Sequence, residues 1–180
     1  IAYQILVNSV KKNKVSHAYL IELNDSYLGL DFAYAISKFL LCPNNYTNNN
    51  KCENCNQCNV IDQNNYLELK VVKPDGKNIK KNQILDLQNE FKNKSLIGKN
   101  KIYILEEAEK LNEEAANALL KFLEEPYEGI IAILLTKNSN QLYNTIKSRC
   151  QVIKLKDKKI KTNESTIKKI SDYIFLSEED

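Results

Sequence analysis

Short apolar runs alternate with amphipathic stretches along this chain. The runs are apolar enough for buried β-strands at residues 17–23, 66–72, 101–105, 130–136 and 151–155. Between them, apolar side chains recur at helical spacing, which predicts helices over 1–13, 31–41, 79–92 and 112–126. Strands that alternate with helices build βαβ units. We therefore expect an α/β fold with a five-stranded, largely parallel sheet that helices cover on both faces.

Two of the predicted helices carry start signals. Asp31 opens the second helix and Asn112 opens the fourth, and both residue types accept hydrogen bonds from the free N–H groups of a first helical turn. The two glutamates that follow Asn112 suit the positive end of a helix. Asp31 and Asn112 are therefore predicted N-caps. The later polar positions of the fourth helix are interpreted as its solvated face, at Lys121, Glu124 and Glu125.

The composition changes after Leu155. Residues 156–166 are polar and rich in lysine, and the amphipathic stretch that follows is too short for a domain. We expect residues 1–157 to form the core domain. Residues 158–180 are expected to form a linker and the first helix of a truncated second domain, and the linker lysines are interpreted as hydrated rather than bound to DNA.

Charge and hydropathy narrow the class of protein. The formal net charge of +3 is small and its charges are scattered, which indicates solubility rather than a dedicated nucleic-acid surface. The sequence has no apolar run of about 18 residues, and its start lacks the features of a signal peptide. We therefore expect a cytoplasmic protein without membrane contact.

Four of the five cysteines lie close together in the sequence. Cys42, Cys52, Cys55 and Cys58 have the spacing C-x9-C-x2-C-x2-C, in which tight turns allow the thiolates to converge on one ion. A four-sulfur set without an open position favours a structural Zn²⁺ site. An iron–sulfur cluster is a less favoured alternative, and a redox C-x-x-C is less favoured still. Cys150 is expected to be a core thiol.

Two further motifs are specific to a family. Residues 117–126 read NALLKFLEEP, and residues 148–150 read SRC. Together with HAYL at 17–20 and the order of the cysteines, they resemble bacterial clamp-loader ATPases over residues 1 to about 160. The resemblance implies an AAA+ (RecA-like) fold with a zinc module at about 42–58. It also implies that residues 158–180 begin a helical lid domain.

The phosphate-binding loop of that family is degraded in this chain. Leu23 falls where the first glycine belongs, Gly29 where the lysine belongs, and Leu30 where the Mg²⁺-binding hydroxyl belongs. The family's Asp-Glu pair at the end of a later strand is replaced by Glu106 and Glu107. We therefore expect a remnant of a nucleotide site, with no ATP bound and no intrinsic ATPase. Thr136 and Lys137 occupy the position at which this family senses bound nucleotide, and without nucleotide they have nothing to sense.

Arg149 is the single arginine of the chain. In the resembled family, the arginine of the SRC motif, here beside Ser148, contacts the γ-phosphate of ATP held by the next subunit. The retained cysteine cluster, the degraded loop and the retained SRC motif together resemble the delta-prime type of subunit in the DNA polymerase III holoenzyme. This resemblance implies motor subunits (gamma/tau) and delta as partners in a hetero-pentamer, and a sliding clamp as its target. Primer-template DNA is a further candidate partner. Two alternatives remain: an ATP-hydrolysing motor subunit, and a zinc-stabilised interaction domain unrelated to replication.

Overall fold

The computed structural model describes residues 14–23, 26–42, 55–63, 65–92 and 100–155. Within these ranges the chain forms one five-stranded sheet with the order β2-β3-β4-β1-β5, in which every neighbouring pair is parallel. The strands are β1 (Ala18–Glu22), β2 (Leu69–Val72), β3 (Lys101–Leu105), β4 (Ile130–Thr136) and β5 (Gln151–Lys154). The predicted α/β fold with a parallel five-stranded sheet is confirmed.

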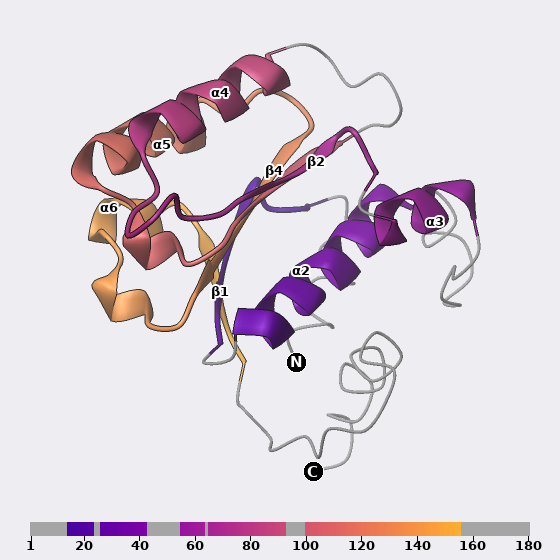
Figure 1. Ribbon diagram of the computed structural model, residues 1–180, viewed down its shortest axis with the longest axis horizontal. Coiled ribbons are helices and arrows are strands. Elements are labelled where there is room, and N and C mark those ends of the chain that lie inside the picture. Colours follow the sequence, from indigo (N-terminus) through magenta and orange to yellow (C-terminus); the bar gives the residue numbers. More distant parts are fainter. Residues whose placement is uncertain (1–13, 24–25, 43–54, 64, 93–99, 156–180) are drawn as a thin grey trace.

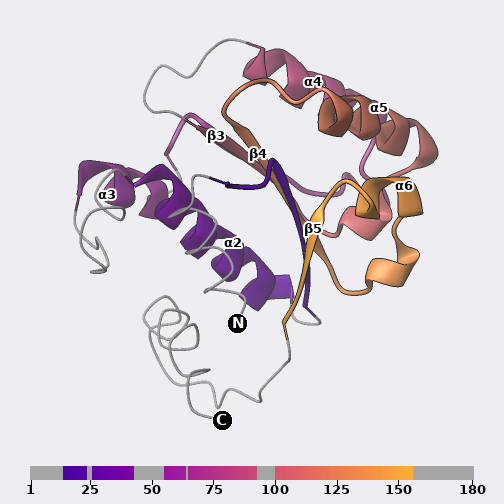
Figure 2. The ribbon, with the colours of Figure 1, turned by 180° about the vertical axis from the view of Figure 1, so that it is seen from behind.

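Helices cover both faces of the sheet. They are α2 (Ser26–Leu41), α3 (Asn56–Asp62), α4 (Lys81–Phe91), α5 (Glu113–Glu124) and α6 (Asn144–Lys147), with short 3₁₀ helices η2 (Ala108–Lys110) and η3 (Ser139–Gln141). Figures 1 and 2 show α4 and α5 side by side on one face, and α2 with α3 on the other. Within the described ranges, no helix combines the length and apolarity needed to cross a bilayer.

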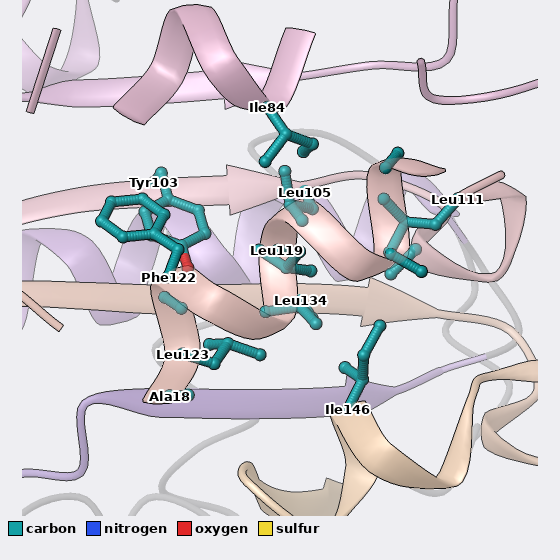
Figure 3. Close-up of a cluster of buried hydrophobic side chains, with 14 of the residues drawn as sticks. Ala18, Ile84, Tyr103, Leu105, Leu111, Leu119, Phe122, Leu123, Leu134 and Ile146 are labelled. Atoms are coloured by element: carbon teal, nitrogen blue, oxygen red, sulfur yellow. The ribbon is translucent and has the colours of Figure 1, made fainter. Parts of the chain in front are cut away.

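The face beneath α4 and α5 holds the larger core. Helix α5 points Leu119, Phe122 and Leu123 into this core, toward the side chains of β3 and β4 (Figure 3). The rings of Tyr103 and Phe122 stack with centroids 5.2 Å apart and planes 10° apart. Each such side chain contributes about 1.5–3 kcal/mol when it leaves water. This packing places the carboxyl end of α5 beside α6.

The opposite face packs against α2. Ile36 and Leu40 of α2 belong to one buried cluster with Ile104 of β3 and Ile133 of β4. Ile102 and Ile104 face this cluster, whereas Tyr103 and Leu105 face the other one. Burial on both faces explains why the central strands are continuous apolar runs rather than alternating ones.

Two of the predicted boundaries were wrong and one was confirmed. Helix α2 begins at Ser26, so Asp31 lies inside the helix and is not its N-cap. Strand β2 begins at Leu69 because the N–H of Leu69 bonds the carbonyl of Tyr66 in a turn, 3.1 Å away. The Asn112 side chain accepts the Ala115 N–H at 2.8 Å, which confirms it as the N-cap of α5.

Other predictions fall outside the described residues or were incomplete. The helix predicted over 1–13 and the boundary near 157, with the second domain of 158–180, lie outside the described ranges. Helix α3 was not predicted at all, because its seven residues sit in a polar, cysteine-rich stretch. The Cys55 side chain accepts the Cys58 N–H and starts this helix, so a predicted metal ligand is also an N-cap.

The α5 core provides a direct test of the packing. Leu119 is fully buried, and its replacement by alanine should lower the free energy of unfolding by about 2–5 kcal/mol through lost burial and a residual cavity. Leu67→Ala is a matched control, because Leu67 is 73% exposed and should change stability by less than about 0.5 kcal/mol. Urea unfolding followed by circular dichroism measures both variants, and equal effects would contradict the arrangement.

Candidate functional site

A pocket of about 410 Å³ opens at the carboxyl ends of β1, β3 and β4. Ligands of open parallel α/β sheets bind at this edge, outside the strand ends. All the positions expected in the nucleotide-site remnant line the pocket: Leu23, Gly29, Leu30, Glu106 and Glu107. The remaining lining residues are Ile21, Lys73, Leu135, Thr136 and Lys137. The structure therefore brings together residues that the sequence places far apart.

The connection between β1 and α2, residues 23–25, contains no glycine. Strand β1 ends at Glu22 and α2 already begins at Ser26, three residues before Gly29. The N–H of Leu23 donates to the carbonyl of Thr136 at 3.0 Å, so it bonds to protein rather than pointing at a ligand. A Cβ added at Gly29 would lie 3.9 Å from both the Leu23 and Leu135 side chains. The side chains nearest to the position from which a phosphate-binding lysine would extend are therefore apolar.

The two carboxylates of the pocket each have lysine partners. Lys73 Nζ lies 3.1 Å from Oε1 of Glu106, and the Glu106 side chain is 19% exposed. Among the described residues, no donor has the geometry of a hydrogen bond to this oxygen, so the contact is an ion pair. Lys110 Nζ lies 2.7 Å from Glu107 Oε2, and Lys137 Nζ lies 3.8 Å from its Oε1. The pocket thus carries its own cations beside the groups that would otherwise face a metal ion.

The backbone of Glu107 is also unusual. Its φ of 48° and ψ of 53° lie in the left-handed region, where a residue with a Cβ is held at a cost of order 1–3 kcal/mol. Glu107 is the N-cap of η2, and its contacts with Lys110 and Lys137 help to hold this conformation. This conformation fixes the direction of the Glu107 side chain at the end of β3.

Three of the four predicted metal ligands lie together. The sulfur atoms of Cys42, Cys55 and Cys58 lie within 4.8 Å of one another, and those of Cys42 and Cys55 are 3.7 Å apart. Thiolates on a tetrahedral Zn²⁺ are about 3.8 Å apart, since Zn–S bonds are about 2.3 Å long. The donor set therefore fits Zn²⁺. The fourth predicted ligand, Cys52, lies outside the described residues.

The chemistry of the thiols also suits a metal centre. Burial raises the pKa of Cys58, and hydrogen bonds and charge from Cys55 and Cys42 raise it further. Without a metal, this thiol stays protonated at neutral pH. A bound ion would hold the end of α2, at Cys42, against the start of α3, at Cys55 and Cys58, and would need to displace protons from the sulfur atoms.

Arg149 lies away from the strand-end pocket, between α6 and β5. It is not among the residues that line the pocket. Its Nη1 donates to the carbonyl of Thr145 at 2.7 Å, and its Nη2 lies 2.5 Å from Oε1 of Glu124. Ser148 ends α6 and donates its hydroxyl to the same Thr145 carbonyl. The SRC motif is therefore a compact turn that presents a partly exposed guanidinium.

Cys150 completes this turn and has a different environment. Its side chain packs against the core cluster beneath α5, and burial raises the pKa of its thiol to about 12. The thiol is therefore protonated and unreactive at neutral pH, as the prediction of a core thiol implies.

Two partners of the site residues were not anticipated. Lys73 follows β2 directly, and the rule that parallel strands end at one edge would have placed it near Glu106. Glu124 was interpreted only as part of a solvated face, whereas it pairs with Arg149. No local signal identifies that pair, because its members are separated by 25 positions and meet only through the packing of α5 and α6.

Comparisons with known proteins agree on one family. The family model described as DNA polymerase III, delta subunit, matches residues 1–159. A Bacillus subtilis protein named DNA polymerase III subunit delta' is 41% identical over 150 residues, which cover 83% of this chain and 45% of that protein. A Haemophilus influenzae protein named subunit tau/gamma is 32% identical over 151 residues, covering 84% and 22%. The chain spans less than half the length of these relatives.

A solved structure shares the fold. The gamma subunit-related protein of Thermotoga maritima DNA polymerase III superposes with a TM-score of 0.65 and 21% identity, covering 86% of this chain and 47% of that one. This comparison independently supports the arrangement of the strands and helices around the pocket.

The cysteine cluster provides a test by metal analysis. We expect one Zn²⁺ per chain, lost in Cys55→Ser and retained in the control Cys150→Ser, whose sulfur packs elsewhere. Because binding must displace a proton from Cys58, the apparent affinity should weaken as the pH falls. Elemental analysis and competition with a chromogenic chelator measure both effects. Retention of metal by Cys55→Ser would contradict the assigned ligand set.

Proposed function

This chain belongs to the DNA polymerase III delta-subunit family, and we propose that it is a non-hydrolysing clamp-loader subunit that supplies Arg149 to a neighbouring motor. One contrast carries the proposal. The strand-end pocket has Gly29 and Leu30 where the family has its phosphate-binding lysine and its Mg²⁺-binding hydroxyl, whereas the SRC turn presents the single arginine of the chain at the surface. A chain with these two properties is suited to assist ATP hydrolysis on another subunit.

The composition of the pocket supports the absence of hydrolysis. A triphosphate needs backbone N–H donors, a lysine and a Mg²⁺ ion held by oxygen ligands. Here Leu23 uses its N–H internally, and leucine side chains flank Gly29. A Mg²⁺ ion at Glu106 would have to compete with Lys73. Nucleotide binding would therefore break the Leu23–Thr136 hydrogen bond and the Lys73–Glu106 ion pair.

The chemistry of arginine supports the role in trans. A guanidinium stays charged at every physiological pH and offers a rigid fork of donors that matches phosphate oxygens. Arginine fingers of this kind stabilise charge on the transferring phosphoryl group and increase the rate by about 10³ to 10⁵. The Arg149 side chain is 33% exposed and sits on a turn held by the Thr145 carbonyl, so its base is fixed while its tip meets solvent.

The wider assembly follows from the family. We propose motor subunits of the gamma/tau type and a delta subunit as partners in a hetero-pentamer that opens a sliding clamp in the cytoplasm. Contact with primer-template DNA is also proposed. Relatives named gamma/tau match more than four-fifths of this chain, which is consistent with subunits that share one fold within one loader. A structural Zn²⁺ would order the module around α3, and residues 158–180 would begin the lid domain.

One observation favours a second candidate, an ATP-hydrolysing motor. The gamma/tau relatives are 31–32% identical to this chain, and the pocket still carries two carboxylates at the expected strand end. This alternative requires the short β1–α2 connection to bind phosphates without glycines, lysine or hydroxyl. A zinc-stabilised module unrelated to replication has no such support, because the family match covers residues 1–159.

Nucleotide binding separates the two candidates. Calorimetry of the purified chain with Mg²⁺ and ATP should detect no binding, because the family's lysine and hydroxyl positions are Gly29 and Leu30 and the carboxylates are paired with lysines. A motor subunit of the same loader, tested under the same conditions, is the positive control. Mg²⁺-dependent binding that is abolished by Glu106→Gln would support the motor instead.

The role of Arg149 is tested in a reconstituted loader that contains the full-length protein. Arg149→Ala should slow the clamp- and DNA-stimulated ATP turnover of the loader, because one motor loses charge stabilisation on its transferring phosphate. Arg149→Lys should not restore the rate, since lysine keeps the charge but lacks the fork of donors.

Lys121→Ala removes a different exposed cation from α5 and serves as the control for net charge. Steady-state turnover at saturating ATP is the measurement. Wild-type turnover in the Arg149→Ala loader would exclude the proposed role.

A further inference from the structure

We propose that Glu124 is a positioning residue for Arg149. In the chain alone, Glu124 holds the guanidinium in a defined and charge-compensated place, and it releases the guanidinium to the triphosphate of the neighbouring subunit. The inference rests on the proposed role of Arg149 in trans and adds a carboxylate that controls when this arginine is available.

The guanidinium is held from two sides. Helix α5 contributes Glu124, its last residue, whose Oε1 lies 2.5 Å from Nη2. The turn after α6 contributes the Thr145 carbonyl, which accepts from Nη1 at 2.7 Å, and the Ser148 hydroxyl at 3.4 Å from the same nitrogen. Two acceptors come from the arginine's own turn and one from a different helix. Among the contacts of the guanidinium with described residues, the one with Glu124 therefore joins it to a separate helix.

The position of Glu124 explains why this contact forms. The carboxyl end of a helix carries partial negative charge, so the adjacent carboxylates of Glu124 and Glu125 are unfavourable there without a cation. Arg149 supplies that cation to Glu124. Among the described residues, Glu125 makes no ion pair, although it occupies the next position and has the same charge. The pairing therefore reflects geometry rather than general attraction between acidic and basic residues.

The pair is exposed enough to exchange. The Arg149 and Glu124 side chains are 33% and 48% exposed, and ion pairs at such sites shift an equilibrium by no more than about fivefold. A phosphate offers more negative charge and a better match to the arginine fork. Once the guanidinium moves, the carboxylate of Glu124 would lie near a triphosphate and repel it. Neutralising Glu124 should therefore favour the engaged state.

Nuclear magnetic resonance tests the holding contact without any partner. The 180-residue chain contains one arginine, so ¹⁵N-arginine labelling reports one guanidinium group. Glu124→Gln keeps the size of the side chain and removes its charge, and it should shift the Arg149 guanidinium signals and make their rotation faster. Glu125→Gln is the matched control and should leave them unchanged. Identical spectra for Glu124→Gln and wild type would overturn the proposal.

The reconstituted loader tests the release. With full-length protein carrying Glu124→Gln, the apparent KM for ATP should fall by up to about fivefold, because the phosphate no longer competes with a carboxylate. The kcat should stay at the wild-type value, and Glu125→Gln should change neither constant. The effect of Glu124→Gln should vanish when Arg149 is alanine. A rise in KM, or a fall in kcat like that of Arg149→Ala, would mean that Glu124 stays bound, and would overturn the release.

The two measurements also separate this inference from the proposed function. If Arg149→Ala leaves the loader unaffected, the role in trans fails and the release step fails with it, while the spectra still decide whether Glu124 holds the guanidinium. If Arg149→Ala slows the loader and Glu124→Gln changes neither the spectra nor KM, the role in trans stands and the positioning role is overturned.

Discussion

Burial of the central strands on both faces is the constraint on which the rest of the structure depends. Strands β3 and β4 are buried along their whole length, so helices must cover each side of the sheet. Crossover helices in turn require the strands to run parallel, and parallel strands end at one edge. This is why Leu23, Glu106 and Thr136 meet in one pocket although they lie at the ends of three different strands.

The carboxylates of the pocket form ion pairs with lysines of the same chain. A carboxylate left alone beside apolar side chains would be costly. Here Lys73 after β2, Lys110 at the end of η2 and Lys137 after β4 supply the opposite charge. The same arrangement recurs at Glu124, where Arg149 compensates a carboxylate at a helix end. The two places differ in the exposure of their carboxylates. Glu106 and Glu107 in the pocket are 19% and 26% exposed, whereas Glu124 at the surface is 48% exposed.

The cysteine cluster lies at the carboxyl end of α2. The segment around α3 is too polar to build an apolar core, yet Cys42 and Cys58 are fully buried there. Three sulfur atoms lie at distances suited to Zn²⁺, and the proposed ion would supply folding free energy there. The Ile61 and Tyr66 side chains then join this module to the core under α2. The module is therefore attached to the sheet by packing as well as by its cysteines.

The sequence by itself determined the two central strands, and its resemblance to the family indicated five of the residues that line the pocket. Apolar runs are local signals, so the ranges 101–105 and 130–136 match β3 and β4, and the parallel topology then gathers the residues at the strand ends. The roles of Arg149 and of the four cysteines remain predictions. Only the tertiary structure decided the early start of α2, the existence of α3, and the pairing of Glu124 with Arg149. The Glu124–Arg149 pair depends on a contact between segments distant in the chain, which spacing and periodicity do not encode. Helix α3 begins at a cysteine N-cap within a polar stretch, where the pattern of apolar positions gives no helical signal.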